Sequence, residues 1–162
     1  MVRAGILLFA AVLAGCQPDD RSNITAPRAE ATNLIAGARD CSVTRVVDGD
    51  TVDLSCPGEG RFRARLMGFD TPETYRARCQ AERRLGEAAG QRLGELAARA
   101  RTSEARFFGY DRYDRRLARL WLDGTDVAST LVSEGLAVRY TGGRRIDWCT
   151  RLGVATEFGS RP

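Results

Sequence analysis

Alternation of apolar and polar residues predicts a hairpin near the start of the folded region. Residues 41–47 and 50–56 both alternate in this way, and Asp48 and Gly49 separate them. Asp-Gly between two strand-like runs is a strong signal for a two-residue turn, because glycine accepts a positive φ. The pattern therefore predicts strands over 41–47 and 50–56 with the turn at 48–49.

Three further strands follow from the same alternation. Residues 61–70, RFRARLMGFD, place apolar side chains on one face and arginines on the other: Phe62, Ala64 and Leu66 against Arg61, Arg63 and Arg65. Residues 104–109 and 116–122 flank the polar turn YDRYDR. With the hairpin, the spacing predicts five short strands.

Two stretches have a helical period. Residues 81–101 place one apolar stripe along a helix, made of Leu85, Ala89, Leu93, Leu96 and Ala100. Gly86, Gly90 and Gly94 weaken this helix and permit close packing. A second helix is predicted from about Thr125 to Glu134, with Gly135 as its stop. Five strands with these helices predict an α+β fold, a five-stranded OB-type β-barrel with helices packed on it.

The N-terminal residues do not fit this folded pattern. Residues 1–16, MVRAGILLFAAVLAGC, have a basic residue, a short apolar run and small residues before Cys16. This is typical of a secretory signal, and LAGC resembles a bacterial lipobox, in which the cysteine is lipidated. We expect residues 17–40 to be a flexible tether and 41–162 the domain. The protein would then be an exported, membrane-anchored lipoprotein facing the periplasm or the cell exterior; a plain signal and a secreted or soluble periplasmic protein are the alternative.

Composition narrows the possible chemistry. Hydrophobic residues make up 43% of the chain and charged residues 28%, which suits a globular protein. All 25 basic residues are arginine, and histidine is absent. The absence of histidine excludes Ser-His-Asp triads, Cys-His dyads and imidazole-ligated zinc. Carboxylates with a hard metal are the chemistry that remains, and the net charge of +4 fits a polyanionic partner only loosely.

Export implies an oxidising compartment, in which the remaining cysteines can pair. Cys41, Cys56, Cys79 and Cys149 allow three pairings. If the hairpin has no bulge, the predicted turn places Cys41 directly opposite Cys56, within disulfide range. Cys79–Cys149 is then the second disulfide.

Acidic residues gather at two predicted strand ends. Asp50 begins the second strand of the hairpin, and Asp70 ends the next strand, just before Thr71 and Glu73 in GFDTPET. Each motif alone is also an ordinary turn or strand exit. If a barrel brings both carboxylates to one rim, together with a backbone carbonyl they make an oxygen-rich site suited to Ca²⁺. Arginines near these acids could grip a phosphate with the planar guanidinium fork.

Three segments in order resemble the signature segments of the staphylococcal nuclease (thermonuclease) family: VVDGDTVDL, RLMGFDTPET and DRYDRRLA. The resemblance covers roughly residues 41–140. Because it contains Cys79, the chain resembles the exported, disulfide-bearing branch of this family. It implies an OB-type barrel and a calcium-dependent endonuclease that hydrolyses phosphodiester bonds of DNA and RNA and leaves 3′-phosphates. We expect such a protein to be a monomer.

The resemblance also implies a role for each matched position. Asp50 and Asp70 match calcium-ligating carboxylates, and Thr71 matches a residue whose backbone carbonyl binds the ion. Glu73 matches the proposed general base. The remaining matched positions are Arg65 and Arg115 on the attacked phosphate, Asp48 near the waters of the metal, Arg112 and Tyr113 near the neighbouring phosphate, and Tyr140 beside the nucleotide.

Two further acids, Asp53 and Asp114, have no matched role. Asp53 is expected to be solvated. Asp114 stands where the family has glycine, and Arg116 follows the matched Arg115 directly; an acid beside a phosphate clamp could weaken substrate binding.

Two other functions are compatible with these segments. The barrel could bind nucleic acid without cutting it, or the chain could be a structural surface lipoprotein whose acids are merely solvated. A degenerate binding module would be expected to lose one of the five matched polar residues, and the chain retains them all: Asp50, Asp70, Glu73, Arg65 and Arg115.

Overall fold

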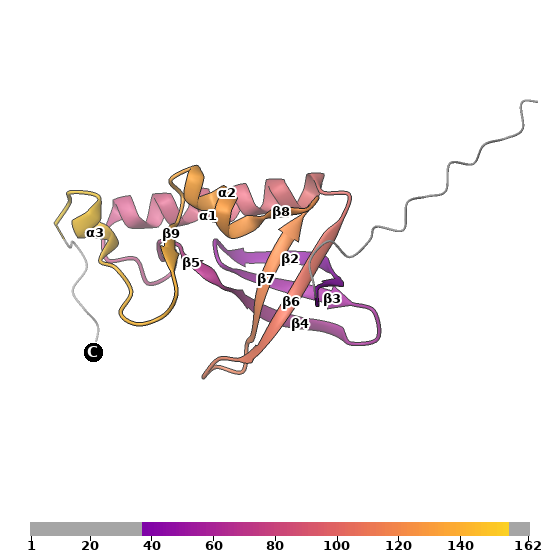
Figure 1. The fold of residues 1–162 in the computed structure, drawn as a ribbon. Helices are drawn as coiled ribbons and strands as arrows, with labels where there is room; N and C mark the ends of the chain where they lie inside the picture. Colours follow the sequence, from indigo (N-terminus) through magenta and orange to yellow (C-terminus); the bar gives the residue numbers. More distant parts are fainter. Residues whose placement is uncertain (1–36, 156–162) are drawn as a thin grey trace, which may run out of the picture. The chain divides into compact units, whose positions relative to one another are not determined.

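The computed structural model describes residues 37–155 of the 162-residue chain. The predicted signal segment, most of the predicted tether and Cys16 lie outside the described residues. Within 37–155 the strands are β1 (Arg39–Asp40), β2 (Ser42–Asp48), β3 (Thr51–Cys56), β4 (Gly60–Leu66), β5 (Gly68–Asp70), β6 (Ser103–Tyr110), β7 (Arg116–Leu122), β8 (Thr125–Asp126) and β9 (Val138–Tyr140). The helices are α1 (Gln80–Arg99), α2 (Val127–Ser133) and α3 (Trp148–Arg151) (Figure 1).

The long strands close on themselves as a barrel. β2, β3 and β4 form an antiparallel meander, β4 pairs with β7 in parallel, and β7 pairs with β6. β1 pairs with β6, and only Cys41 separates β1 from β2 in the chain. The amide of Cys41 donates to the carbonyl of Ser103 at 2.9 Å. The chain from β1 through β2 therefore joins the two outer edges of the sheet, which gives the predicted OB-type barrel.

The interior of the barrel is apolar, and α1 packs against it. The largest fully buried side chains include Leu54, Leu66, Phe69, Leu93, Leu120 and Leu131. Ala64 and Leu66 of β4 are buried while Arg61 and Arg63 are exposed, so the predicted faces of this strand are confirmed. α2 ends as predicted before Gly135, which has a φ of 74°.

The hairpin turn lies one residue later than predicted. β2 extends through Asp48, so the turn residues are Gly49 and Asp50. The cause is local: the Asp48 carboxylate accepts the amide hydrogen of Asp50 at 3.1 Å, which starts the turn after Asp48. Register shifts between Val43 and Arg45 and between Val46 and Asp48 then place two extra residues in β2.

These bulges restore the pairing at the far end of the hairpin. Ser42 lies opposite Ser55, and the next pair outward is the disulfide Cys41–Cys56, with the Cα atoms 4.2 Å apart. The predicted disulfide is correct although the predicted turn was wrong, because the displaced turn and the bulges offset each other. The second predicted disulfide, Cys79–Cys149, also forms.

The predicted strand 61–70 is in fact two strands. β4 ends at Leu66, and β5 leaves the barrel to pair with β9, with Gly68 opposite Tyr140. Gly68 has a φ of 95°, a left-handed conformation that turns the chain between the two strands. Asp70 therefore ends a strand of a separate two-stranded sheet rather than a neighbour of β3. In the described part of the chain, no helix is both long and apolar enough to cross a bilayer.

Candidate active site

The predicted site residues meet at a cleft of about 710 Å³ at one end of the barrel. The β2–β3 turn, the loop after β5, the loop between β6 and β7, and the loop after β9 form its walls. The predicted residues that line it are Asp48, Asp50, Arg65, Thr71, Glu73, Arg112, Tyr113, Arg115 and Tyr140. Asp70 lies beneath this surface, 1% exposed.

Asp50 and Asp70 come from different parts of the fold and contact the same two guanidinium groups. Asp50 is 3% exposed, and the Leu66 amide donates to its backbone carbonyl at 2.7 Å, which fixes the turn against the end of β4. Arg65 contacts both acids: its Nη1 lies 2.6 Å from Oδ1 of Asp50 and its Nη2 lies 3.6 Å from Oδ1 of Asp70. The cleft floor thus holds two buried carboxylates beside one guanidinium.

A second guanidinium, from Arg145, bridges the same carboxylates. Its Nε lies 2.5 Å from Oδ1 of Asp70, its Nη2 lies 3.1 Å from Oδ2 of Asp50, and its Nη1 contacts Glu73. Arg145 was not among the site residues predicted from the sequence. The predicted Cys79–Cys149 disulfide was the available signal, because it ties residues just before Cys149 to the chain that follows Glu73.

Burial and neighbouring groups shift the pKa values of residues in this cluster. Removal from water raises the pKa of Asp48 to about 6, and the negative charge of Asp50 adds to the effect. Burial also raises the pKa of Asp70, although Arg145 and the indole of Trp148 oppose the shift. Burial disfavours the charge of Arg145, but Asp70, Asp50 and Glu73 outweigh it and raise the pKa of Arg145.

The loop that carries Glu73 rests on the first turn of α1. Glu82 is 3% exposed, and its carboxylate accepts the amide hydrogens of Arg78 at 2.6 Å and of Glu73 at 3.4 Å. At Gly86, one turn further along α1, a side chain would clash with the loop, because an added Cβ would lie 2.7 Å from the carbonyl oxygen of Pro72. Helix α1 therefore fixes the backbone of the Glu73 loop.

The opposite wall holds Arg115 in a tight loop before β7. The Asp111 carboxylate accepts the amide hydrogens of Tyr113 at 2.8 Å and of Arg115 at 3.0 Å, and it binds Nε of Arg115 at 2.7 Å. Nη1 of Arg115 lies 3.5 Å from the hydroxyl of Thr51. Asp111, which was not among the site residues predicted from the sequence, thus aims Arg115 across the cleft toward the β2–β3 turn.

Comparison with known proteins assigns the chain to a family. The sequence pattern of the staphylococcal nuclease homologue family matches residues 63–148, more than half of the chain. The chain belongs to the staphylococcal nuclease homologue family. The matched segment contains Arg65, Asp70, Glu73 and Arg115, and also Arg145; Asp50 lies before it.

Several curated relatives are nucleases by name. The chain is 33% identical over 100 residues to a thermonuclease of Staphylococcus intermedius, a match that covers 59% of this chain and 56% of the relative. It is 35% identical over 100 residues to the SPbeta prophage-derived endonuclease YokF of Bacillus subtilis (strain 168), covering 60% of this chain and 33% of that protein. It is 29% identical over 100 residues to an uncharacterized endonuclease of Haemophilus influenzae, covering 62% of this chain and 52% of that protein. The chain thus spans about half or less of the length of these relatives.

Two departures from the family pattern now have a structural explanation. Asp114, where the family has glycine, has a φ of 60°, a conformation that glycine adopts freely and that aspartate tolerates. Arg116 points away from the cleft: it pairs with Glu59 and lies over the rings of Phe62 and Phe107, 4.3 and 4.1 Å from their centroids. Arg115 and Arg116 therefore belong to different surfaces.

The aromatic residues of the cleft lie at its rim. Tyr113 is 60% exposed, with the guanidinium of Arg112 4.7 Å from its ring centroid. The Tyr140 hydroxyl donates to the carbonyl of Gly143 at 2.5 Å. Asp53 lies outside the cleft and is not merely solvated as expected, because it pairs with Arg63 directly opposite on β4 at 2.9 Å.

The donor set of the cleft suits a hard divalent cation. Asp50 and Asp70 offer buried carboxylate oxygens that already converge on positive groups, the guanidiniums of Arg65 and Arg145. Oxygen-only ligands favour Ca²⁺ or Mg²⁺ over softer metals. A second acid-and-sulfur cluster, Cys79, Glu82 and Cys149, is not a comparable site because its sulfurs are joined in a disulfide.

Proposed function

We propose that this protein is a calcium-dependent nuclease that hydrolyses phosphodiester bonds of DNA, RNA or both and leaves 3′-phosphates. The observation that carries the proposal is the convergence of Asp50, Arg65 and Arg115 in one cleft, with the buried Asp70 directly beneath its surface. Membership of a nuclease family supports it.

The residues that would hold the ion are Asp50, Asp70 and the backbone carbonyl of Thr71. Thr71 is buried and lines the cleft directly after Asp70. Calcium is the expected ion because it accepts oxygen ligands in irregular geometry. When bound, the ion supplies Lewis-acid polarisation of a phosphoryl oxygen.

Glu73 is the proposed general base. Its side chain reaches the cleft while Glu82 fixes its backbone, so its carboxylate can accept a proton from a water near the carboxylate cluster. General-base catalysis requires it to lie within about 3 Å of that water, directly or through one further water. Arg65 and Arg115 would hold the attacked phosphate and stabilise the charge that develops in the transition state.

The rim residues would bind the neighbouring nucleotides. Arg112 and Tyr113 stand beside Arg115, and Tyr140 lines the other side of the cleft. Exposed aromatic rings next to arginines suit the stacking of unpaired bases and the binding of phosphates. We therefore expect single-stranded substrates to be cut faster than duplexes, with a rate that falls as salt rises.

The role of Glu73 is tested by Glu73→Gln, with Glu87→Gln as the matched control. Glu87 is exposed on α1 and does not line the cleft. The proposal predicts a loss of about 10²–10³-fold in kcat for Glu73→Gln and no change for the control. The measurement is release of acid-soluble nucleotides, with identification of the phosphate-bearing product end. Parent-rate digestion by a folded Glu73→Gln variant would remove Glu73 from the mechanism.

A second candidate function is nucleic-acid binding without hydrolysis. Arg145 supports it, because its guanidinium offsets the negative charge that would otherwise repel a phosphate from Asp50 and Asp70. Oligonucleotide binding without cleavage in saturating Ca²⁺ would favour this function over the nuclease.

We also propose export and a lipid anchor on Cys16. The N-terminal LAGC motif supports the proposal, and so do the two disulfides of the described domain, which are typical of an oxidising compartment. Metabolic labelling with a radioactive fatty acid should mark the parent chain and not Cys16→Ala. Equal labelling of both chains would rule out Cys16 as the lipidated residue.

A further inference from the structure

The Arg145 guanidinium stands at the point where the proposed metal ligands converge. Its Nε donates to Oδ1 of Asp70 at 2.5 Å and its Nη2 donates to Oδ2 of Asp50 at 3.1 Å, while Nη1 contacts Glu73. Calcium binds carboxylate oxygens at about 2.3–2.6 Å, so an ion on Asp50 and Asp70 would require much of the same space. Two positive groups in that space would also repel each other.

We propose that Arg145 is a built-in competitor for the metal site, and that a divalent cation binds Asp50 and Asp70 only by displacing its guanidinium. The inference rests on the proposed function only in taking these two acids as the metal ligands. It predicts that Arg145 weakens metal binding, which is the opposite of the effect expected for an arginine that merely supports the site.

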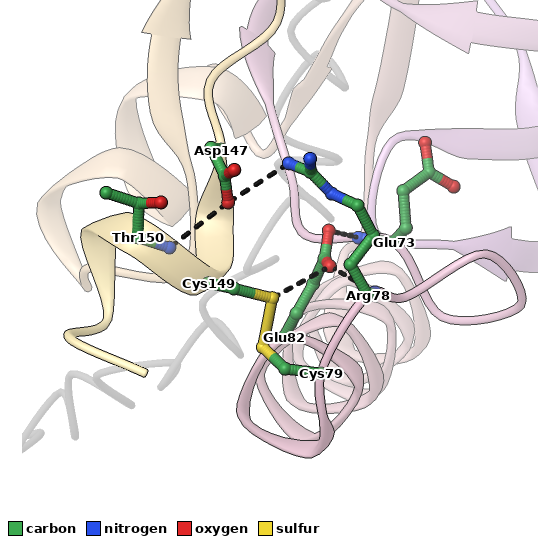
Figure 2. The surroundings of a disulfide bond; sticks show 7 residues. All are labelled: Glu73, Arg78, Cys79, Glu82, Asp147, Cys149 and Thr150. Carbon is green, nitrogen blue, oxygen red and sulfur yellow. Dashed lines mark hydrogen bonds and ion pairs between the residues drawn. A yellow bond between two sulfur atoms is a disulfide. The ribbon is translucent and has the colours of Figure 1, made fainter. Parts of the chain in front are cut away.

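Covalent and polar contacts hold the segment after Arg145 in place. Cys149 is joined to Cys79 at the start of α1, with its Sγ 3.5 Å from Oε2 of Glu82 (Figure 2). Figure 2 also shows Asp147, which pairs with Nη2 of Arg78 at 3.0 Å and accepts the amide hydrogen of Thr150 at 3.1 Å. The residues that follow Arg145 are therefore fixed to the loop that carries Glu73.

Trp148 adds a contact to the carboxylate itself. Its Nε1 donates to Oδ2 of Asp70 at 3.3 Å, and the side chain is 3% exposed. The disulfide, the Arg78–Asp147 ion pair and this indole together keep Arg145 at a high effective concentration beside Asp50 and Asp70. The Cys79–Cys149 disulfide should therefore increase the competition with metal.

The first test is a calorimetric titration of the full chain with Ca²⁺. Arg145→Ala and Arg145→Gln are expected to lower the Kd for Ca²⁺ at least tenfold. Arg144→Ala is the matched control, because Arg144 is an exposed neighbour of the same charge with no ion pair to another described residue; its Kd should stay within twofold of the parent value. Unchanged or weaker binding by both Arg145 variants would overturn the proposal.

A second readout reports on the site itself. Tb³⁺ binds in place of Ca²⁺, and its emission is sensitised by a nearby indole, here Trp148 next to Asp70. The sensitised emission should reach half-saturation at a lower Tb³⁺ concentration in Arg145→Gln than in the parent chain. Asp70→Asn in the Arg145→Gln background should abolish this signal; persistence of the signal would place the ion elsewhere and overturn the proposal.

The disulfide is tested by paired replacements. Cys79→Ser with Cys149→Ser should tighten Ca²⁺ binding by a few-fold, less than Arg145→Ala. Cys41→Ser with Cys56→Ser removes the other disulfide, which lies at the far end of the hairpin, and should leave the Kd unchanged. Equal Kd values for both disulfide variants would contradict a role for Cys79–Cys149. Circular dichroism confirms that each variant is folded before titration.

Nuclease assays on the same preparations separate the two proposals. Tighter Ca²⁺ binding by the Arg145 variants without digestion by any chain would support the competition and refute the nuclease. Calcium-dependent digestion with an unchanged Kd in the Arg145 variants would support the nuclease and refute the competition.

Discussion

The two walls of the cleft are held in place by different kinds of interaction. Asp50 immediately precedes β3, Arg65 lies near the end of β4 and Arg115 immediately precedes β7, so all three adjoin strands whose backbones are hydrogen-bonded in register. Glu73 and Arg145 lie on irregular segments that depend on side chains: the Glu82 carboxylate, the Cys79–Cys149 disulfide and the Arg78–Asp147 pair. We call the first the barrel wall and the second the loop wall.

This difference determines whether a substitution affects only the chemical step or also the position of neighbouring residues. On the barrel wall the Arg65 and Arg115 side chains can be removed without moving their neighbours, because the backbone ladder holds the strands and the Asp111 carboxylate still accepts the amide hydrogens of the Arg115 loop. A side chain that supports the loop wall cannot be removed in this way, since its contacts also position Glu73 and Arg145. Substitutions in the two walls should therefore have different combinations of effects on rate and stability.

The largest expected effect is on the barrel wall, at Arg115. Arg115→Ala should lower kcat about 10²–10³-fold, equivalent to roughly 3–4 kcal/mol, because it removes a preorganised donor to the attacked phosphate. Arg116→Ala is the matched control, since Arg116 faces Phe62 and Phe107 away from the cleft. It should keep kcat and lose about 1 kcal/mol of stability. Steady-state kinetics and thermal unfolding of both variants check the prediction, and equal rate losses would contradict it.

A smaller effect is expected on the loop wall, at Gly86. Gly86→Ala should destabilise the fold by about 1–3 kcal/mol and also lower kcat, because the added Cβ meets the Pro72 carbonyl at 2.7 Å and displaces the Glu73 loop. Gly94→Ala on the same helix has no atom within 4 Å of the added Cβ. It should stabilise the protein by about 0.5–1 kcal/mol at unchanged kcat. Urea unfolding and kinetics measure both; a stabilising Gly86→Ala would contradict the packing described here.

The smallest expected effect is at Asp114, beside the phosphate clamp. Asp114→Gly removes a side chain from a residue with a φ of 60° and an acid from the neighbourhood of Arg115. It should change stability by less than about 1 kcal/mol and lower KM for nucleic acid at low salt. KM measured at low and high salt tests this, and an increase in KM would show that Asp114 helps rather than hinders substrate binding.

The same two walls explain what the sequence could predict. Strands and the faces of β4 follow from local periodicity, the Cys41–Cys56 pair follows from the hairpin, and Cys79–Cys149 is the pair that remains. The resemblance to the staphylococcal nuclease family identified the residues that meet in the cleft. Arg145, Trp148 and Glu82 belong to no periodic pattern that marks function, and their contacts arise only when the chain after β9 returns to α1. The turn and the break at Gly68 were mispredicted because a side-chain hydrogen bond and one backbone dihedral decide them.

Digestion of single-stranded DNA by the purified chain in Ca²⁺, compared with the same reaction in excess chelator, tests the nuclease proposal most directly. Asp70→Asn serves as the variant in which the buried carboxylate is lost but the side-chain shape is kept. We predict rapid hydrolysis by the parent chain in Ca²⁺, and none with chelator or with Asp70→Asn. Hydrolysis that persists in chelator, or at the parent rate in Asp70→Asn, would contradict the account.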